Sequence, residues 1–168
     1  MRRPYTARMY RRLVERLAAS VPDLGLGADV IAGHPGETEA DFAETLALVR
    51  DLPFSYLHVF SYSDRKGTEA ARRADRLPAR TVTDRSRRLR DVSREKSLAF
   101  RRRLHGRTVP VLVLEGRDRV RGFRTGLTAN YVEVRFPGDE ARARDIVPVI
   151  VTEAAEDATF GRLAGASE

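Results

Sequence analysis

The sequence predicts an α/β domain that is followed by a small all-β barrel. Helical and extended patterns alternate through residues 1–104, which is typical of parallel strands joined by helices. After Gly106 the pattern changes to short apolar runs that are separated by glycine and proline turns. We therefore expect two domains, at residues 1–104 and 105–165, in a chain of 168 residues.

The first domain is expected to begin with a helix over residues 5–20, where Met9, Leu13 and Leu17 share one face. A strand over 24–32, a helix over 38–51, a strand over 54–62 and a basic helix over about 83–104 follow. This order implies parallel strands with right-handed crossovers. Because two strands cannot form a stable parallel sheet that is covered on both faces, we expect further strands from a partner or from a missing N-terminal portion.

The segment 29–42 combines a β-branched strand, a turn with Gly33 and Gly36, and a helix start. Thr38 and Asp41 have the spacing of a capping box at this helix start. Ligands of parallel sheets bind where strands end and loops begin, so the turn is a candidate small-molecule site. A turn that only connects two elements is an equally good explanation of the same residues.

The second domain is expected to contain strands over residues 108–115, 120–125, 130–136 and 146–153, in a small barrel or sandwich. Basic and aromatic residues are interleaved around its first hairpin, which suits RNA phosphates and unstacked bases. The candidate RNA-binding residues are Arg117, Arg119, Arg121, Phe123, Arg124 and Tyr131. A place in the barrel core is the alternative for the two aromatic residues.

The net charge of +7 comes from one segment of the chain. Between Arg80 and Arg107, eleven basic residues stand against three acidic residues, which leaves +8. A basic stripe of this density favours a polyanionic partner such as RNA. A solvated helix face in an arginine-rich composition is the alternative.

The sequence contains no cysteine, so it offers no disulfide, no thiolate metal site and no iron–sulfur ligand. It shows no secretory signal and no apolar run long enough to span a bilayer. We therefore predict a cytoplasmic protein without a membrane partner, and we assign no metal ligand and no catalytic residue to it.

Several motifs occur in order along the chain. They are Met1-Arg-Arg-Pro-Tyr-Thr6, the strand–turn–helix segment 28–42, Leu57-His-Val-Phe-Ser-Tyr-Ser-Asp-Arg-Lys-Gly-Thr-Glu-Ala-Ala71, Thr125-Gly-Leu-Thr-Ala-Asn-Tyr-Val-Glu-Val134 and Phe136-Pro-Gly-Asp139. Together they resemble the C-terminal part of the radical S-adenosylmethionine methylthiotransferases, which modify tRNA or a ribosomal protein. Leu57-His-Val-Phe60 is most similar to the branch that acts on threonylcarbamoyladenosine beside the tRNA anticodon.

The resemblance implies that residues 1–104 are the last part of a radical S-adenosylmethionine barrel and that residues 105–165 are a TRAM domain, an OB-like RNA-binding barrel. It implies S-adenosylmethionine and a 4Fe–4S cluster as cofactors of the full-length enzyme, and the anticodon stem-loop of tRNA as partner. Complete members hold the cluster with a Cys-x-x-x-Cys-x-x-Cys motif, which this sequence lacks. The chain is therefore expected to be a fragment that binds RNA but is inactive alone.

Within this resemblance, the backbone at Gly33 and Gly36 would approach the adenosine of S-adenosylmethionine, with Ile31 or Ala32 as apolar backing. Arg65 would hold a substrate phosphate or carboxylate, and a surface ion pair is its equally good alternative.

His58 is expected to be a hydrogen-bonded core histidine, with a barrel lumen as its other possible environment. Two other functions fit the sequence as a whole. One is a stand-alone TRAM-type RNA-binding protein without catalysis, and the other is a fragment of a ribosomal-protein methylthiotransferase.

Overall fold

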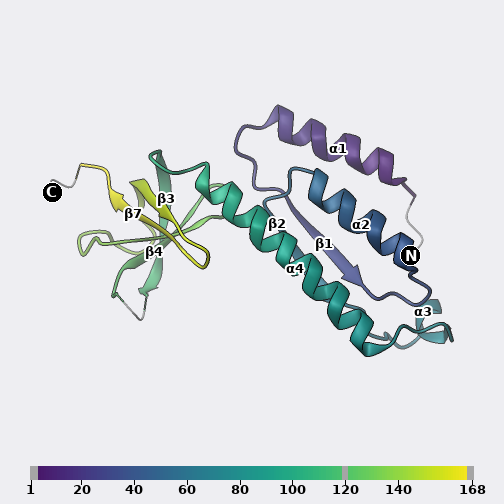
Figure 1. Cartoon of the computed structure of the whole chain (residues 1–168). Helices are drawn as coiled ribbons and strands as arrows, with labels where there is room; N and C mark the ends of the chain where they lie inside the picture. Colours follow the sequence, from purple (N-terminus) through teal and green to yellow (C-terminus); the bar gives the residue numbers. More distant parts are fainter. Residues whose placement is uncertain (1–3, 119–120, 166–168) are drawn as a thin grey trace. The chain divides into compact units, whose positions relative to one another are not determined.

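A computed structural model describes residues 4–118 and 121–165 of the chain. The chain divides into two compact units, Met1–Lys96 and Ser97–Glu168 (Figure 1). The division falls inside the 24-residue helix α4 (Ala79–Arg102), a few residues before the expected boundary at residue 104. The first unit is an α/β arrangement and the second contains a closed β-barrel, so this part of the fold prediction is confirmed.

The first unit begins with α1 (Ala7–Ser20), β1 (Gly27–Ala32), α2 (Glu39–Asp51), β2 (Tyr56–Ser61) and the short α3 (Glu69–Arg72), and α4 follows. Thr38 caps α2 by accepting a hydrogen bond from the Asp41 N–H, and the Asp41 carboxylate accepts one from the Thr38 N–H at 2.9 Å. The predicted capping box is therefore confirmed. Helix α3 was not predicted, although the Thr68 side chain caps it by accepting a hydrogen bond from the Ala71 N–H.

Strands β1 and β2 pair in parallel, in register from Gly27 with Tyr56 to Ala32 with Ser61. Helices α2 and α4 cover one face of the pair (Figure 1). The core on this face is built from Phe42 and Leu46 of α2 and from Leu89 and Val92 of α4, with side chains of both strands. The radical barrel that the family resemblance implies is not shown, because the described sheet has two strands.

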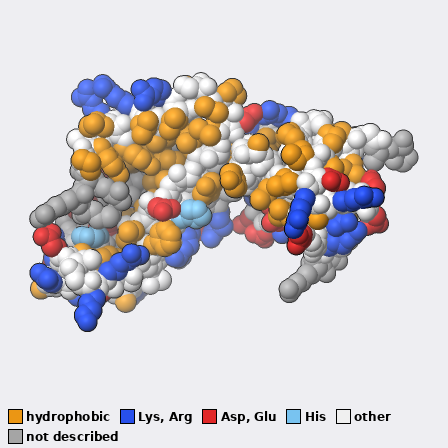
Figure 2. Space-filling model, turned by 180° about the vertical axis from the view of Figure 1, so that it is seen from behind, with side chains coloured by type: hydrophobic (Ala, Val, Ile, Leu, Met, Phe, Trp, Pro, Cys, Tyr) orange, Lys and Arg blue, Asp and Glu red, His pale blue; other side chains and the backbone are white. Residues whose placement is uncertain are grey.

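The opposite face of the sheet is open. Side chains alternate along strands, so this face carries Gly27, Asp29, Ile31, Tyr56, His58 and Phe60. Ile31 and Phe60 keep 40% and 52% of their surface exposed. Figure 2 shows hydrophobic side chains gathered on the side of the first unit that is turned away from α2 and α4. His58 is exposed here, so the expectation of a core histidine is wrong.

The outer edge of β2 is closed by a side chain of α4. The Ser93 hydroxyl accepts a hydrogen bond from the Leu57 N–H at 2.8 Å and donates one to the Leu57 carbonyl at 3.2 Å. Ser93 thus takes the place of a neighbouring strand at Leu57. The outer edge of β1 has no paired strand within the described residues, so it is the edge at which a further strand can add.

Helix α1 contacts the core through a different stripe from the one that its sequence suggests. Val14 is buried, and the ring of Tyr10 lies 6.3 Å from that of Phe54. The predicted shared face of Met9, Leu13 and Leu17 is present but faces solvent, with 57%, 43% and 38% of each residue exposed. Val14 and Tyr10 are the α1 side chains that pack against the core.

The second unit contains a closed five-stranded barrel of β3 (Thr108–Arg117), β4 (Arg124–Thr128), β5 (Glu133–Phe136), β7 (Thr159–Leu163) and β6 (Ile146–Ala154), in that spatial order. Pairing of β3 with β6 closes it, and β5 and β7 run parallel. Five-stranded closure is consistent with the expected TRAM-like, OB-like barrel. Val111, Val134, Phe136, Val149 and Val151 fill its core.

The predicted strands differ from the observed ones at two places. The strand expected over residues 120–125 begins only at Arg124, and β7 was not predicted. Gly161 in the centre of β7 weakens the strand pattern in the sequence. A Cβ atom at Gly161 would lie 2.5 Å from a methyl group of Val149 and 2.7 Å from the Ile150 carbonyl oxygen, so close strand contact requires glycine there.

Arg101, near the end of α4, braces the turn between β6 and β7. Its guanidinium donates hydrogen bonds to the carbonyl oxygens of Ala155, Glu156 and Ala158 at 2.7–2.9 Å. Burial lowers the pKa of Arg101. The turn carbonyls therefore have a charged partner from the helix, and this basic residue is unavailable to an external ligand.

Candidate functional site

The turn after β1 has a local structural reason for both of its glycines. Gly33 and Gly36 have φ angles of +83° and +81°, a region that glycine adopts without strain. The Gly33 N–H donates to the Glu37 carboxylate at 2.6 Å, and a Cβ atom at Gly33 would lie 2.6 Å from a Val82 methyl group. A Cβ atom at Gly36 would collide with Arg73. Turn geometry alone explains the glycines, and their contact with a cofactor stays a prediction.

The two apolar residues predicted to support a cofactor lie on opposite faces of the sheet. The side chain of Ile31 is exposed on the open face, whereas Ala32 is 1% exposed on the face covered by helices. Of the two, Ile31 is the side chain that a ligand on the open face can contact.

Arg85 of α4 fastens this turn to the helix. Its side chain is 5% exposed and donates hydrogen bonds to the carboxylates of Glu37 at 2.9 Å and Glu39 at 3.0 Å. The guanidinium also lies 5.1 Å from the ring centroid of Phe42. Because the Glu37 carboxylate accepts from both Arg85 and Gly33, one chain of contacts holds the backbone of the turn in place.

The sequence did not single out Arg85 as a structural residue. Its one signal is the helical spacing that Arg85 shares with Leu89 and Val92, which face the core. Lys96 continues this stripe and donates hydrogen bonds at 2.7 Å to the carbonyls of Arg50 and Leu52 at the end of α2. The basic segment is therefore partly used inside the protein, and its outward-facing arginines remain candidates for RNA contact.

The end of β2 lies beside the turn after β1. The rings of His34 and Tyr62 lie 5.4 Å apart. The Tyr62 hydroxyl donates to Asp64 at 3.1 Å, and burial together with this bond raises the pKa of Tyr62. Arg76 pairs with Asp64 and lowers the pKa of its carboxyl group. Arg65 is exposed and has no ion pair with a described residue, so its charge is available to an anionic ligand.

The predicted arginines of the barrel have different environments. Arg117 pairs with Asp139 at 2.6 Å and donates to the Gly122 carbonyl at 2.9 Å. Arg124 is the register partner of Arg117 on β4, and its Nε is buried without a hydrogen-bond partner. Arg119 lies outside the described residues. The structure thus brings Arg117 and Arg124 together across the β3–β4 ladder.

The predicted aromatic residues of the barrel also differ. Tyr131 is 80% exposed with φ at +62°, so the alternative of a core position is wrong for it. Phe123 is half-buried and meets Phe160 edge to face. Phe160 was not predicted as a site residue, although its neighbour Arg162 repeats the aromatic-plus-basic pattern that marked the first hairpin.

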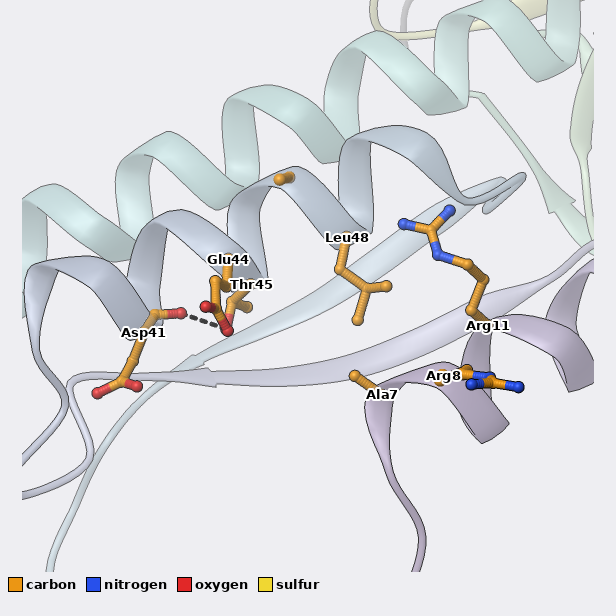
Figure 3. Close-up of a pocket in the computed structure, with 8 residues that line it drawn as sticks. Ala7, Arg8, Arg11, Asp41, Glu44, Thr45 and Leu48 are labelled. Atoms are coloured by element: carbon orange, nitrogen blue, oxygen red, sulfur yellow. Dashed lines mark hydrogen bonds between the residues drawn. The ribbon is translucent and has the colours of Figure 1, made fainter.

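A groove of about 600 Å³ lies between α1 and α2, away from all predicted site residues. Figure 3 shows arginines of α1 on one side and polar side chains of α2 on the other. Arg11 at this groove pairs with Asp51 at 3.0 Å. The lining residues are Ala7, Arg8, Arg11, Asp41, Glu44, Thr45, Ala47 and Leu48.

Across residues 4–118 and 121–165, no group of three or more histidine, aspartate and glutamate side chains is arranged to hold a metal ion. Over the same residues, no helix combines the length and the apolar character needed to cross a membrane.

Comparison with known proteins gives a consistent set of relatives. The chain is 39% identical over 158 residues to the tRNA-2-methylthio-N(6)-dimethylallyladenosine synthase of Acidothermus cellulolyticus, 41% over 161 residues to that of Frankia alni, and 37% over 162 residues to that of Desulfitobacterium hafniense. These matches cover 92%, 92% and 96% of the chain, but 32%, 32% and 36% of the relatives. No family model matches the sequence.

The relatives bear on two expectations from the sequence. The chain spans about a third of the length of the curated relatives that it matches. Their names specify dimethylallyladenosine, so the expected threonylcarbamoyladenosine branch, which rested on Leu57-His-Val-Phe60, is not supported. The long matches at this identity show that the chain is homologous to part of the tRNA-2-methylthio-N(6)-dimethylallyladenosine synthases, which are tRNA methylthiotransferases.

Proposed function

We propose that this chain forms the tRNA-binding barrel and one wall of the cofactor pocket of a tRNA methylthiotransferase that acts on dimethylallyladenosine. The observation that carries the proposal is the identity of 37–41% to enzymes of that name over almost the whole chain. The chain corresponds to about a third of the length of those enzymes. We therefore expect the complete reaction to require protein segments beyond this chain.

The proposed cofactor wall is the carboxyl end of β1 and β2. Ile31 offers an exposed apolar surface for an adenine ring beside the turn of Gly33, and Arg65 offers a free positive charge after the second strand. S-adenosylmethionine, when bound, would supply the methyl group and the radical chemistry of the reaction. The chain cannot hold a 4Fe–4S cluster because it has no cysteine, so the cluster ligands must come from elsewhere in the enzyme.

The proposed tRNA surface is the barrel. Arg117, Arg121 and Arg124 would neutralise phosphates, and Tyr131 offers an exposed ring on which an unpaired base of the anticodon stem-loop can stack. Tyr131 is held in a left-handed conformation, which costs free energy for a bulky residue and is common at ligand contacts. The turn that carries it is braced by the Thr128 hydroxyl, which accepts from the Val132 N–H at 2.9 Å.

The test is a binding and turnover experiment with the purified chain. We expect it to bind an anticodon stem-loop RNA with an affinity that falls as salt rises, and to produce no methylthiolated nucleoside with S-adenosylmethionine and a reductant. Product formation by this chain alone would contradict the proposal that the chemistry needs other parts of the enzyme. Absence of RNA binding would contradict the proposed function. Binding that survives Arg117→Ala and Arg121→Ala together would move the RNA site to α4.

The same preparation separates the two alternative functions. A monomeric and cooperatively folded chain that binds tRNA tightly would favour a stand-alone RNA-binding protein. Competition by a ribosomal protein but not by tRNA would favour a protein-modifying relative, which the names of the homologues do not support.

A further inference from the structure

We infer that Arg121, backed by Phe160 and Phe123, forms a stacking site for one unpaired RNA base. This inference rests on the proposed binding of tRNA by the barrel. It assigns a binding role to Phe160 of β7 and gives Arg121 a role beyond that of a phosphate contact.

The three side chains form a compact cluster. The rings of Phe123 and Phe160 meet edge to face, with centroids 6.5 Å apart and planes at 83°. The guanidinium carbon of Arg121 lies 4.8 Å from the centroid of Phe160 and 5.8 Å from that of Phe123. These distances are typical of cation–π contacts, so the two rings fix the position of the guanidinium group.

The backbone beneath Arg121 is also held. The Arg121 N–H donates to the Asp118 carboxylate at 2.7 Å, and the Asp118 N–H donates to the Phe123 carbonyl at 2.8 Å. These two bonds join Asp118, just after β3, to Arg121 and Phe123, just before β4. A ligand therefore meets a side chain whose base and tip are both restrained, which reduces the entropy lost on binding.

The Arg121 guanidinium makes cation–π contacts with Phe160 and Phe123, in contrast to that of Arg117, which pairs with Asp139. Arg121 is exposed, whereas Phe123 and Phe160 are half-buried. The guanidinium therefore lies on aromatic carbon on its inner side and meets solvent on its outer side. A planar, electron-rich group is the ligand that this outer surface suits best.

An unpaired nucleobase is such a group. Bases released from a helix stack on guanidinium planes as well as on aromatic rings, whereas the bases of a duplex already stack on each other. The position in the barrel agrees with this chemistry. The cluster joins the connection after the first barrel strand to the fifth strand, and OB-type barrels bind oligonucleotides at their first and fourth connections.

The test uses the full chain and a short single-stranded RNA that carries 2-aminopurine, with the same sequence in a duplex for comparison. We expect Arg121→Ala and Phe160→Leu each to lower the affinity for the single strand by about 5- to 100-fold and to remove the quenching of 2-aminopurine. Phe160→Leu removes no charge, so the salt dependence of binding should not change. Arg142→Ala, which removes one exposed charge elsewhere on the second unit, should change the affinity by less than about 3-fold.

The outcomes separate this inference from the proposed function. If the unaltered chain binds no RNA, both are overturned. A second outcome is that the unaltered chain binds RNA, that the Arg121 and Phe160 variants bind it equally well, and that thermal melting shows both variants to be folded. This outcome overturns the stacking site alone. Equal losses in Arg121→Ala and Arg142→Ala, with none in Phe160→Leu, would reduce Arg121 to an ordinary phosphate contact and would also overturn it.

Discussion

The two units of this chain deal with apolar surface in opposite ways. In the barrel, closure pairs every strand on both sides, and Phe136 and four core valines are 0% exposed. In the first unit, a two-stranded sheet leaves one face open, and Ile31, Phe60 and the α1 stripe of Met9, Leu13 and Leu17 face solvent. Each unit has a buried core, and the barrel exposes the aliphatic side chains of Leu112 and Ile146. The first unit differs because it exposes one whole sheet face and a helix stripe, an apolar surface of the kind that partners cover.

The difference also decides where function can be tested. The proposed RNA binding needs no further strands, because its candidate residues belong to the unit with the closed barrel. The proposed cofactor wall lies at the ends of β1 and β2, on a sheet that has two strands within the described residues. We therefore expect RNA binding to survive in this chain and cofactor binding to require a covering partner.

The largest expected effect compares one residue type in the two environments. Phe136→Ala should destabilise the barrel by about 3–5 kcal/mol, because Phe136 is 0% exposed and its loss leaves a cavity. Phe60→Ala, on the open sheet face, should change the stability of the first unit by less than about 1 kcal/mol. Chemical denaturation followed by NMR signals of each unit would measure both changes.

A large loss of stability in Phe60→Ala would contradict this comparison. It would mean that the open face is covered in solution, for example by a second copy of the chain. Sedimentation at several concentrations would then show self-association, and Phe60→Ala would weaken it.

Local chemistry explains which features could be predicted from the sequence. The capping box of Thr38 and Asp41 depends on residues three positions apart, and the parallel pairing follows from the order of elements. The buried face of α1 and the exposure of His58 depend instead on which neighbours cover each surface. An apolar stripe in a sequence does not reveal whether its partner is present.

The site shows the same limit. The basic and aromatic residues of the first hairpin could be recognised because they lie close together in the sequence. Phe160 could not, because the barrel brings β7 to that hairpin from a distant segment. Arg85 is one of the basic residues between Arg80 and Arg107 that favoured a polyanionic partner, but folding places it against Glu37. The expected substrate branch rested on four residues, too few to outweigh similarity along the whole chain.

The second effect concerns the buried arginine of the first unit. Arg85→Gln should cost about 2–3 kcal/mol, because it leaves the Glu37 carboxylate without its charged partner and loosens the turn at Gly33. Arg88→Gln is the matched control, since Arg88 is 40% exposed and reaches Glu39 only at 3.4 Å, and should cost less than about 1 kcal/mol. Urea denaturation of both variants measures the loss in the free energy of unfolding. Equal losses would show that the buried ion pair of Arg85 with Glu37 contributes no more than the exposed contact of Arg88.

A third and smaller difference is expected in acid. Hydrogen bonds lower the pKa of Glu39 through Arg85, of Asp41 through Thr38, of Asp64 through Arg76 and of Asp75 through Arg73, all in the first unit. A carboxyl group whose pKa is lowered in the folded state stabilises that state at pH values above its ordinary pKa, which is 4.5 for Glu and 3.8 for Asp. This stabilisation is lost as the pH falls below the ordinary pKa and through the lowered one. Protection against hydrogen exchange, expressed relative to the intrinsic exchange rate at each pH, should therefore fall more in the first unit than in the barrel between pH 5 and pH 3. A barrel that loosens first would refute the assignment.

The smallest expected change in stability is that of Tyr131→Gly in the barrel. Glycine relieves the left-handed backbone at φ +62°, but it also raises the entropy of the unfolded chain, and the two effects nearly cancel. We expect the melting temperature to stay within about 4 °C of the unaltered chain, while the affinity for single-stranded RNA falls by about 5-fold or more. Tyr131→Phe keeps the ring and should bind normally. If Tyr131→Gly unfolds the barrel, Tyr131 is a structural residue; if it binds RNA unchanged, the exposed ring has another use.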